Sequence, residues 1–209
     1  MAIFRRLLRS TPVAADPLLE QLASMPVPLA DAGSFVAGFE RDETQSQVSP
    51  ASPAERKAGA VAQLTVQWNI PAAALDAHFE VENATPFLQW VRQLVLILTD
   101  AEAAARWFAE GSSRFRKYEG REVSGFRYGK ILVSPLADVA DQAEVLTGAN
   151  ERRGTRFVDT YVIVRSGRIF GTVSASTFGE LDVRNELEDL SRKLVARIKT
   201  AADSVRVAP

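Results

Sequence analysis

Four ionisable residues stand at alternate positions in one short segment of the chain. Asp76, His78, Glu80 and Glu82 are separated by single apolar residues. This period of two predicts a strand over residues 75–82 that projects all four side chains from one face. Imidazole and carboxylate groups together can bind a divalent metal ion. His78, with Asp76 and Glu80 beside it, is therefore the candidate centre of a metal-dependent or hydrolytic site, and it is the only histidine in the chain.

The same alternation also fits a half-buried strand whose polar face meets water. Neighbours on one strand face stand about 7 Å apart, because the rise is about 3.3 Å per residue, so they do not converge on one ion. We therefore predict no metal and no cofactor. An enzyme that acts through His78 remains an alternative.

Other chemistry lacks its residues or motifs. The chain has no cysteine, which excludes disulfides, thiolate zinc sites and a cysteine nucleophile. A nucleophile elbow, a P-loop and a dinucleotide-binding glycine motif are also missing from the sequence. Arginines are interleaved with aromatic residues over 114–130, a pattern that can bind single-stranded nucleic acid or cover the edge of a sheet. The net charge of -1 favours the second interpretation, and we do not expect nucleic acid as a partner.

Large aromatic residues are the candidates for contact with a small ligand. A tryptophan can fill the core or line a groove, and exposure of Trp90 would make it the leading candidate for a groove. The residues that we predict to line a ligand site are Trp68, Trp90, Phe126 and Tyr128.

The first 33 residues are predicted to form an arm that contains short helices. Phe4, Leu7 and Leu8 lie opposite Arg5 and Arg6 on a helical wheel. These five residues could dock on a membrane surface or a protein partner, or form a short helix packed on their own domain. A second short helix is predicted over residues 16–25.

Apolar runs in the sequence are too short to cross a membrane. The run at 94–98 falls far short of the roughly 20 residues that a span requires. The basic N-terminus also lacks the apolar segment of a secretory signal. As written, the chain is expected in the cytoplasm, and outside it if a leader has been removed.

Residues 34–209 are predicted to form a single α+β domain, an antiparallel sheet with two long amphipathic helices packed against it. A polar loop or insertion is expected over 42–57, a turn with a helical piece over 135–145, and a charged loop over 148–154. One helix should begin with a capping box at 99–102 and run to about 118. The last helix should bury Leu187, Leu190, Leu194, Ile198 and Val205. The expected strands cover 34–41, 60–69, 75–82, 89–98, 127–134, 161–165 and 168–173.

Three segments together carry a family resemblance: 96–108, 136–145 and the hairpin 161–170. In this order they resemble bacterial extracytoplasmic sensor-like domains, namely the outer domain of mycobacterial-type serine/threonine kinases and related lipoproteins. The resemblance covers residues 34–202 and implies a non-catalytic module that binds a ligand or a protein partner in a cleft between sheet and helices. The alternatives are an accessory subunit docked through its N-terminal arm and the enzyme acting through His78.

Overall fold

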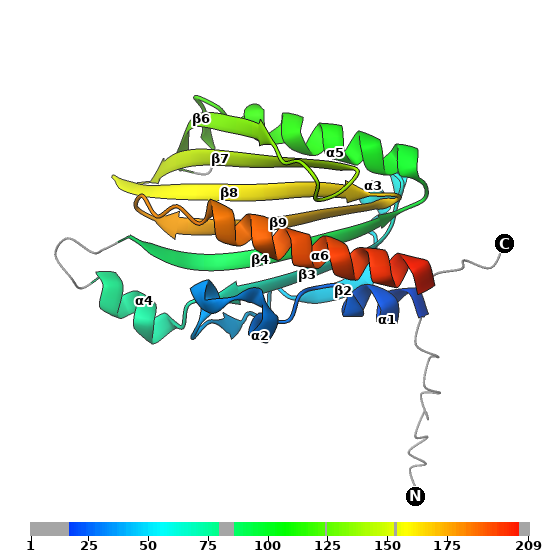
Figure 1. Cartoon of the computed structure of the whole chain (residues 1–209). Helices are drawn as coiled ribbons and strands as arrows, with labels where there is room; N and C mark the ends of the chain where they lie inside the picture. The colour runs from blue at the N-terminus through cyan, green and yellow to red at the C-terminus, as the bar shows by residue number, and fades with distance from the viewer. Residues whose placement is uncertain (1–16, 80–85, 124, 153, 205–209) are drawn as a thin grey trace, which may run out of the picture.

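A single antiparallel sheet of nine strands organises the molecule (Figure 1). The computed structural model describes residues 17–79, 86–123, 125–152 and 154–204. The strand order is β1-β3-β4-β9-β8-β7-β6-β5, and β2 pairs with β3 beside this path. The strands are β1 (Glu40–Arg41), β2 (Gln47–Pro50), β3 (Ala60–Asn69), β4 (Phe87–Leu98), β5 (Glu122–Val123), β6 (Phe126–Pro135), β7 (Gln142–Arg152), β8 (Thr155–Ser166) and β9 (Ile169–Phe178).

Helices lie on both faces of this sheet, so the chain is an α+β protein, as predicted. Two long helices, α5 (Ala101–Arg116) and α6 (Arg184–Ser204), make most of the helical contacts with the central strands. The shorter ones are α1 (Pro17–Ser24), α2 (Leu29–Ala32), the 3-10 helix η1 (Ser34–Val36), α3 (Pro53–Lys57) and α4 (Ala72–Phe79). Within the described residues, none of the helices is long and apolar enough to cross a bilayer.

Strand β8 shows why both faces are covered. Val162 and Val164 are buried in the core cluster that contains α6, whereas Ile163 is buried in the cluster that contains α5. Adjacent residues of a strand project to opposite faces, so the two long helices lie on opposite sides of the sheet. The predicted stripe of α6 is confirmed for Leu187, Leu190, Leu194 and Ile198, which are at most 1% exposed, and Val205 lies outside the described residues.

The face under α6 also holds the N-terminal segment. Leu22, Met25 and Val27 belong to the same core cluster as α6. The side-chain amide of Gln93 on β4 accepts a hydrogen bond from the backbone N–H of Val27 and donates one to its carbonyl oxygen, both at 2.9 Å. Arg197 of α6 donates to the carbonyl oxygen of Met25 at 3.1 Å. The division into an arm over 1–33 and a domain over 34–209 stays a prediction.

Several predicted elements were wrong. The segment 34–41 holds η1 and the two-residue β1 in place of a strand, and the loop over 42–57 contains β2 and α3. The charged segment 148–154 continues β7 as far as Arg152. Residues 137–141 form turns and bends with no helical piece. In the last hairpin Ser166 pairs with Ile169, so Gly167 and Arg168 make the turn, with Gly167 at a φ of 55°.

Candidate ligand-binding cavity

A partly open hollow lies where α5 ends above strands β6, β7 and β8. It is a cavity of about 270 Å³, close to the lower limit of about 300 Å³ for small-molecule pockets. Its lining combines aromatic and aliphatic side chains with one carboxylate and one amide. The lining residues are Phe115, Tyr118, Val123, Tyr128, Ile131, Leu146, Gly148, Asn150, Asp159 and Tyr161.

The strand register explains why a hollow forms here. Asp159 on β8 lies directly opposite Gly148 on β7, and Gly148 has no side chain to fill the floor. A Cβ at Gly148 would stand 3.3 Å from Cγ1 of Ile131, which lies opposite it on β6. Helix α5 covers this face of the sheet only as far as Arg116. The space beyond the helix end therefore remains open above the three strands.

Aromatic rings form two walls of the cavity. The ring centroids of Phe115 and Tyr161 are 4.1 Å apart, and those of Tyr118 and Tyr128 are 5.3 Å apart. None of these three tyrosine hydroxyls makes a hydrogen bond to another described residue, and Tyr118 is 40% exposed. The hydroxyls therefore reach space that a ligand or water can occupy.

Asp159 is the charged group of the site. The Asn150 side-chain amide donates a hydrogen bond to its Oδ2, and the Ser176 side chain is hydrogen-bonded to it as well. Burial raises the pKa of the Asp159 carboxyl above 3.8, against the opposing effect of these two hydrogen bonds. Among the described residues, no lysine or arginine forms an ion pair with it. The carboxylate thus lies in the molecule without a cationic partner.

The negative charge of Asp159 raises the pKa of two tyrosines in the cavity walls, Tyr161 and Tyr128. Burial raises the pKa of Tyr161, and the negative charge of Asp159 raises it further. The pKa of Tyr128 is raised by the same two causes in the same order. A nearby negative charge disfavours formation of a phenolate, so the interior of the cavity has a negative potential when Asp159 is ionised.

We expect Asp159→Asn to stabilise the folded protein at pH 7, by on the order of 1 kcal/mol. A pKa raised on folding means that the native state holds the Asp159 proton more tightly than the unfolded state does. The stability of the wild type therefore falls as the pH rises from about 3.8 through the folded-state pKa, and the deficit is complete above it. Asparagine keeps the shape and has no such cost. Urea unfolding at pH 7 and pH 3.5 measures the difference.

The advantage of Asp159→Asn should shrink toward pH 3.5, where the wild-type carboxyl is protonated in both states. Asp31→Asn serves as a matched control, because Asp31 is exposed on α2 and should change stability by less than about 0.5 kcal/mol. A lower stability of Asp159→Asn at pH 7 would show that the ionised carboxylate contributes favourably to the fold.

A second groove, larger at about 550 Å³ and more open, contains Trp90 toward the opposite edge of the sheet. It lies between the ends of β1 and β3, the start of α4 and Trp90 of β4. The polar side chains there form a chain of hydrogen bonds: Asn69 donates to Asp42 at 2.8 Å, Gln67 donates to Asn69 at 2.8 Å, and Arg92 donates to Gln67. These polar groups form hydrogen bonds with one another, so few of them are available to bind a ligand.

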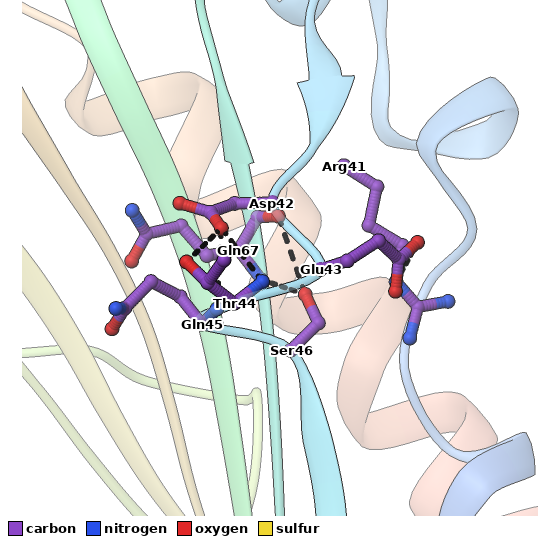
Figure 2. Close-up of polar contacts among 7 residues, drawn as sticks. All are labelled: Arg41, Asp42, Glu43, Thr44, Gln45, Ser46 and Gln67. Atoms are coloured by element: carbon purple, nitrogen blue, oxygen red, sulfur yellow. Dashed lines mark hydrogen bonds and ion pairs between the residues drawn. The ribbon is translucent and has the colours of Figure 1, made fainter.

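Asp42 in this groove closes a tight turn between β1 and β2 (Figure 2). Its Oδ1 accepts hydrogen bonds from the hydroxyl of Thr44 at 2.6 Å and from the backbone N–H groups of Thr44 at 2.9 Å and Gln45 at 3.2 Å. The Thr44 hydroxyl is the main cause that lowers the pKa of Asp42. Ser46 accepts from the backbone N–H of Gln67 at 3.1 Å and so fixes the turn to β3. This arrangement is one of local structure, and it favours the α5 cavity as the functional site.

The predicted ligand-contacting aromatics are dispersed. Tyr128 lines the α5 cavity and Trp90 lines the second groove, about half-buried beneath Arg92. Trp68 is 2% exposed in the core and lines neither opening. Phe126 packs against the ring of Phe157 and lies outside the cavity lining. A ligand contact at any of these residues stays a prediction.

The strand on which the metal and hydrolase hypotheses depended does not exist between residues 75 and 79. Asp76 and His78 belong to α4, and positions two apart on a helix lie on nearly opposite sides of its axis. Glu80 and Glu82 lie outside the described residues. In the part of the chain that the structure describes, no group of three or more histidine, aspartate or glutamate residues could hold a metal ion. The described residues also do not include those predicted to dock on a membrane or a partner, Phe4, Arg5, Arg6, Leu7 and Leu8.

The sequence patterns did not predict four of the residues that line the cavity: Phe115, Tyr118, Asn150 and Asp159. The available signal was a single aspartate inside a strand of otherwise apolar, aromatic and hydroxyl residues, Phe157 to Val164. A buried acid in such a strand requires hydrogen-bond donors nearby. The identity of those donors depends on the pairing of β7 with β8, which the sequence alone does not specify.

Comparison with known proteins bears on the fold. Neither a protein family nor a curated protein matches the sequence. Among solved structures, the extracellular domain of PknH from Mycobacterium tuberculosis superposes with a TM-score of 0.58. The match covers 91% of this chain and 98% of that domain, at 12% sequence identity. The two share a fold. The predicted resemblance to kinase outer domains is thus supported at the level of architecture.

Proposed function

We propose that this protein is a non-catalytic binding module that takes a small ligand in the α5 cavity. The observation that carries the proposal is the combination of ring walls and a half-buried carboxylate in one hollow, lined by Tyr128, Asp159 and Tyr161 among others. Pockets that are mostly apolar with a few polar groups are the usual form of small-molecule sites. A module of this fold in the extracellular domain of PknH favours a place outside the cytoplasmic membrane for this chain too.

The arrangement favours binding over catalysis. Asp159 is held by Asn150 and Ser176, both neutral, and the described lining contains no serine, histidine or lysine that it could activate. A general acid or base requires a partner or substrate group within hydrogen-bond reach. The groups present can orient and desolvate a ligand.

Val123→Trp should abolish binding by filling the mouth of the cavity. Val123 is a half-buried lining residue on the short strand β5, where an indole can project into the hollow. We expect compounds bound by the wild type to lose at least about tenfold in affinity, the equivalent of about 1.4 kcal/mol. Ligand-observed NMR with a panel of cationic, anionic and neutral small molecules measures the change on the full chain.

Val48→Trp provides the matched control. Val48 is 38% exposed on β2, and β2 and β5 lie at opposite edges of the sheet. This control variant should leave every binding signal unchanged, and circular dichroism should show that both variants are folded. If no compound of any charge distinguishes Val123→Trp from Val48→Trp, the cavity does not bind small ligands and the proposal fails.

A further inference from the structure

The lining of the α5 cavity is selective in its charge. Asp159 is the only carboxylate among the described lining residues, which include no lysine, arginine or histidine. An anionic ligand would face this carboxylate with no positive group to compensate for it. A cationic ligand would find a partner for a charge that burial already disfavours.

The rings add a second attraction of the same sign. The face of an aromatic ring carries partial negative charge and attracts a cation within about 6 Å of its centroid. Tyr118 and Tyr128 form one wall and Phe115 and Tyr161 form another, with Asp159 in the same lining. Rings around a carboxylate provide the two features that bind an alkylammonium group: low polarity for the methyl or methylene groups and negative potential for the nitrogen.

Arg92 is a cation on this face of the sheet that acts on one of the cavity rings. Arg92 is close enough to Tyr161 to lower its pKa slightly, against the larger effects of burial and Asp159. Its guanidinium donates to Gln67 Oε1 and lies 5.3 Å from the ring centroid of Trp90. Arg92 does not line the cavity. At Tyr161 the effect of Arg92 on the pKa is smaller than that of Asp159, so the negative charge of Asp159 dominates there.

We propose that the α5 cavity binds a small organic cation, an alkylammonium group that pairs with Asp159 and contacts the faces of the surrounding rings. The inference rests on the proposed function, because it names the class of ligand for the same cavity. Recognition takes place without a reaction: no bond forms or breaks, and the ammonium nitrogen remains charged in the complex.

The test compares choline with 3,3-dimethyl-1-butanol, in which carbon replaces the charged nitrogen at nearly constant shape. Binding to the full chain is followed by the NMR shifts of the methyl groups of Val123, Ile131 and Leu146. We expect choline to bind at least about tenfold more tightly than the alcohol. Asp159→Asn should reduce choline affinity by at least about tenfold and leave the affinity of the alcohol unchanged. Asp31→Asn should change neither.

The outcomes separate the two proposals. If the alcohol binds as tightly as choline or more tightly, or if Asp159→Asn leaves the choline affinity intact, the proposal of a cationic ligand is wrong. The cavity would then still bind a ligand, and Val123→Trp should still abolish that binding. The proposal of a cationic ligand is also wrong if an anionic or neutral compound of the panel binds and choline does not. If no compound of any class binds, both proposals fall.

Discussion

Replacement of Gln93 by leucine is expected to lower the free energy of unfolding by about 2–4 kcal/mol. The side chain of Gln93 is fully buried, and its amide satisfies both the N–H and the carbonyl oxygen of Val27. Each buried backbone group left without a partner costs about 1–3 kcal/mol. The added apolar contacts of leucine offset part of this loss. Urea unfolding followed by circular dichroism measures the change.

The loss should be concentrated in the N-terminal segment. Hydrogen exchange at the N–H of Val27 should accelerate by more than at strand β8, because Gln93 is the group that protects it. Gln63→Leu is the matched control: Gln63 is half-buried on the neighbouring β3, and its replacement should cost less than about 1 kcal/mol. A Gln93→Leu protein as stable as the wild type would show that Val27 finds other partners at no cost.

Gly129→Ala is expected to destabilise the protein by about 1–3 kcal/mol and to weaken binding in the α5 cavity. A Cβ at Gly129 would stand 2.8 Å from the carbonyl oxygen of Ala149 on β7. The contact is with backbone, so only a movement of one strand against the other relieves it. Gly129 lies in the bulge between Tyr128 and Ile131, which both line the cavity. Thermal unfolding and choline titration measure the two effects.

Gly111→Ala should change stability in the opposite direction. Gly111 lies inside α5, and its added Cβ would make an ordinary contact at 3.5 Å with the ring of Phe170. Alanine is favoured over glycine in a helix interior by about 1 kcal/mol, so this variant should be more stable than the wild type. If Gly129→Ala were also neutral or stabilising, the close approach of β6 to β7 would not limit that position.

The long elements could be predicted because burial imposes their periodicity. Helix α6 carries a continuous apolar stripe because it buries one side against the sheet, and β4 is rich in apolar residues because both of its faces are covered. Along α6 the i,i+4 ion pairs Glu188–Arg192 and Asp189–Lys193 have nitrogen–oxygen distances of 3.7 and 2.8 Å. The predicted capping box at 99–102 was wrong: Asp100, one residue after Thr99, caps α5 by accepting a hydrogen bond from the backbone N–H of Ala103.

The errors occurred where neighbours in space decide the structure. Residues 75–79 alternate like a strand, but three alanines before Leu75 favour a helix, and the carbonyl of Pro71 accepts hydrogen bonds from Ala74 and Leu75 that begin its first turn. The charged residues near 151 continue β7 because β8 supplies their backbone partners, as in the pair Glu151–Arg156. The cavity was missed for the same reason, since the pairing of Gly148 with Asp159 is a property of the register.

The lining of the cavity comes from one uninterrupted run of the chain, from Phe115 to Tyr161. The end of α5, the turn after it and strands β5 to β8 supply the described lining, and the N-terminal half of the sheet adds none of the lining residues described. Ligand specificity can therefore change through substitutions within residues 115–161, while β3, β4, β9 and α6 keep the rest of the fold unchanged. Exchange of that portion with the equivalent part of another protein of this architecture would transfer ligand choice as a unit.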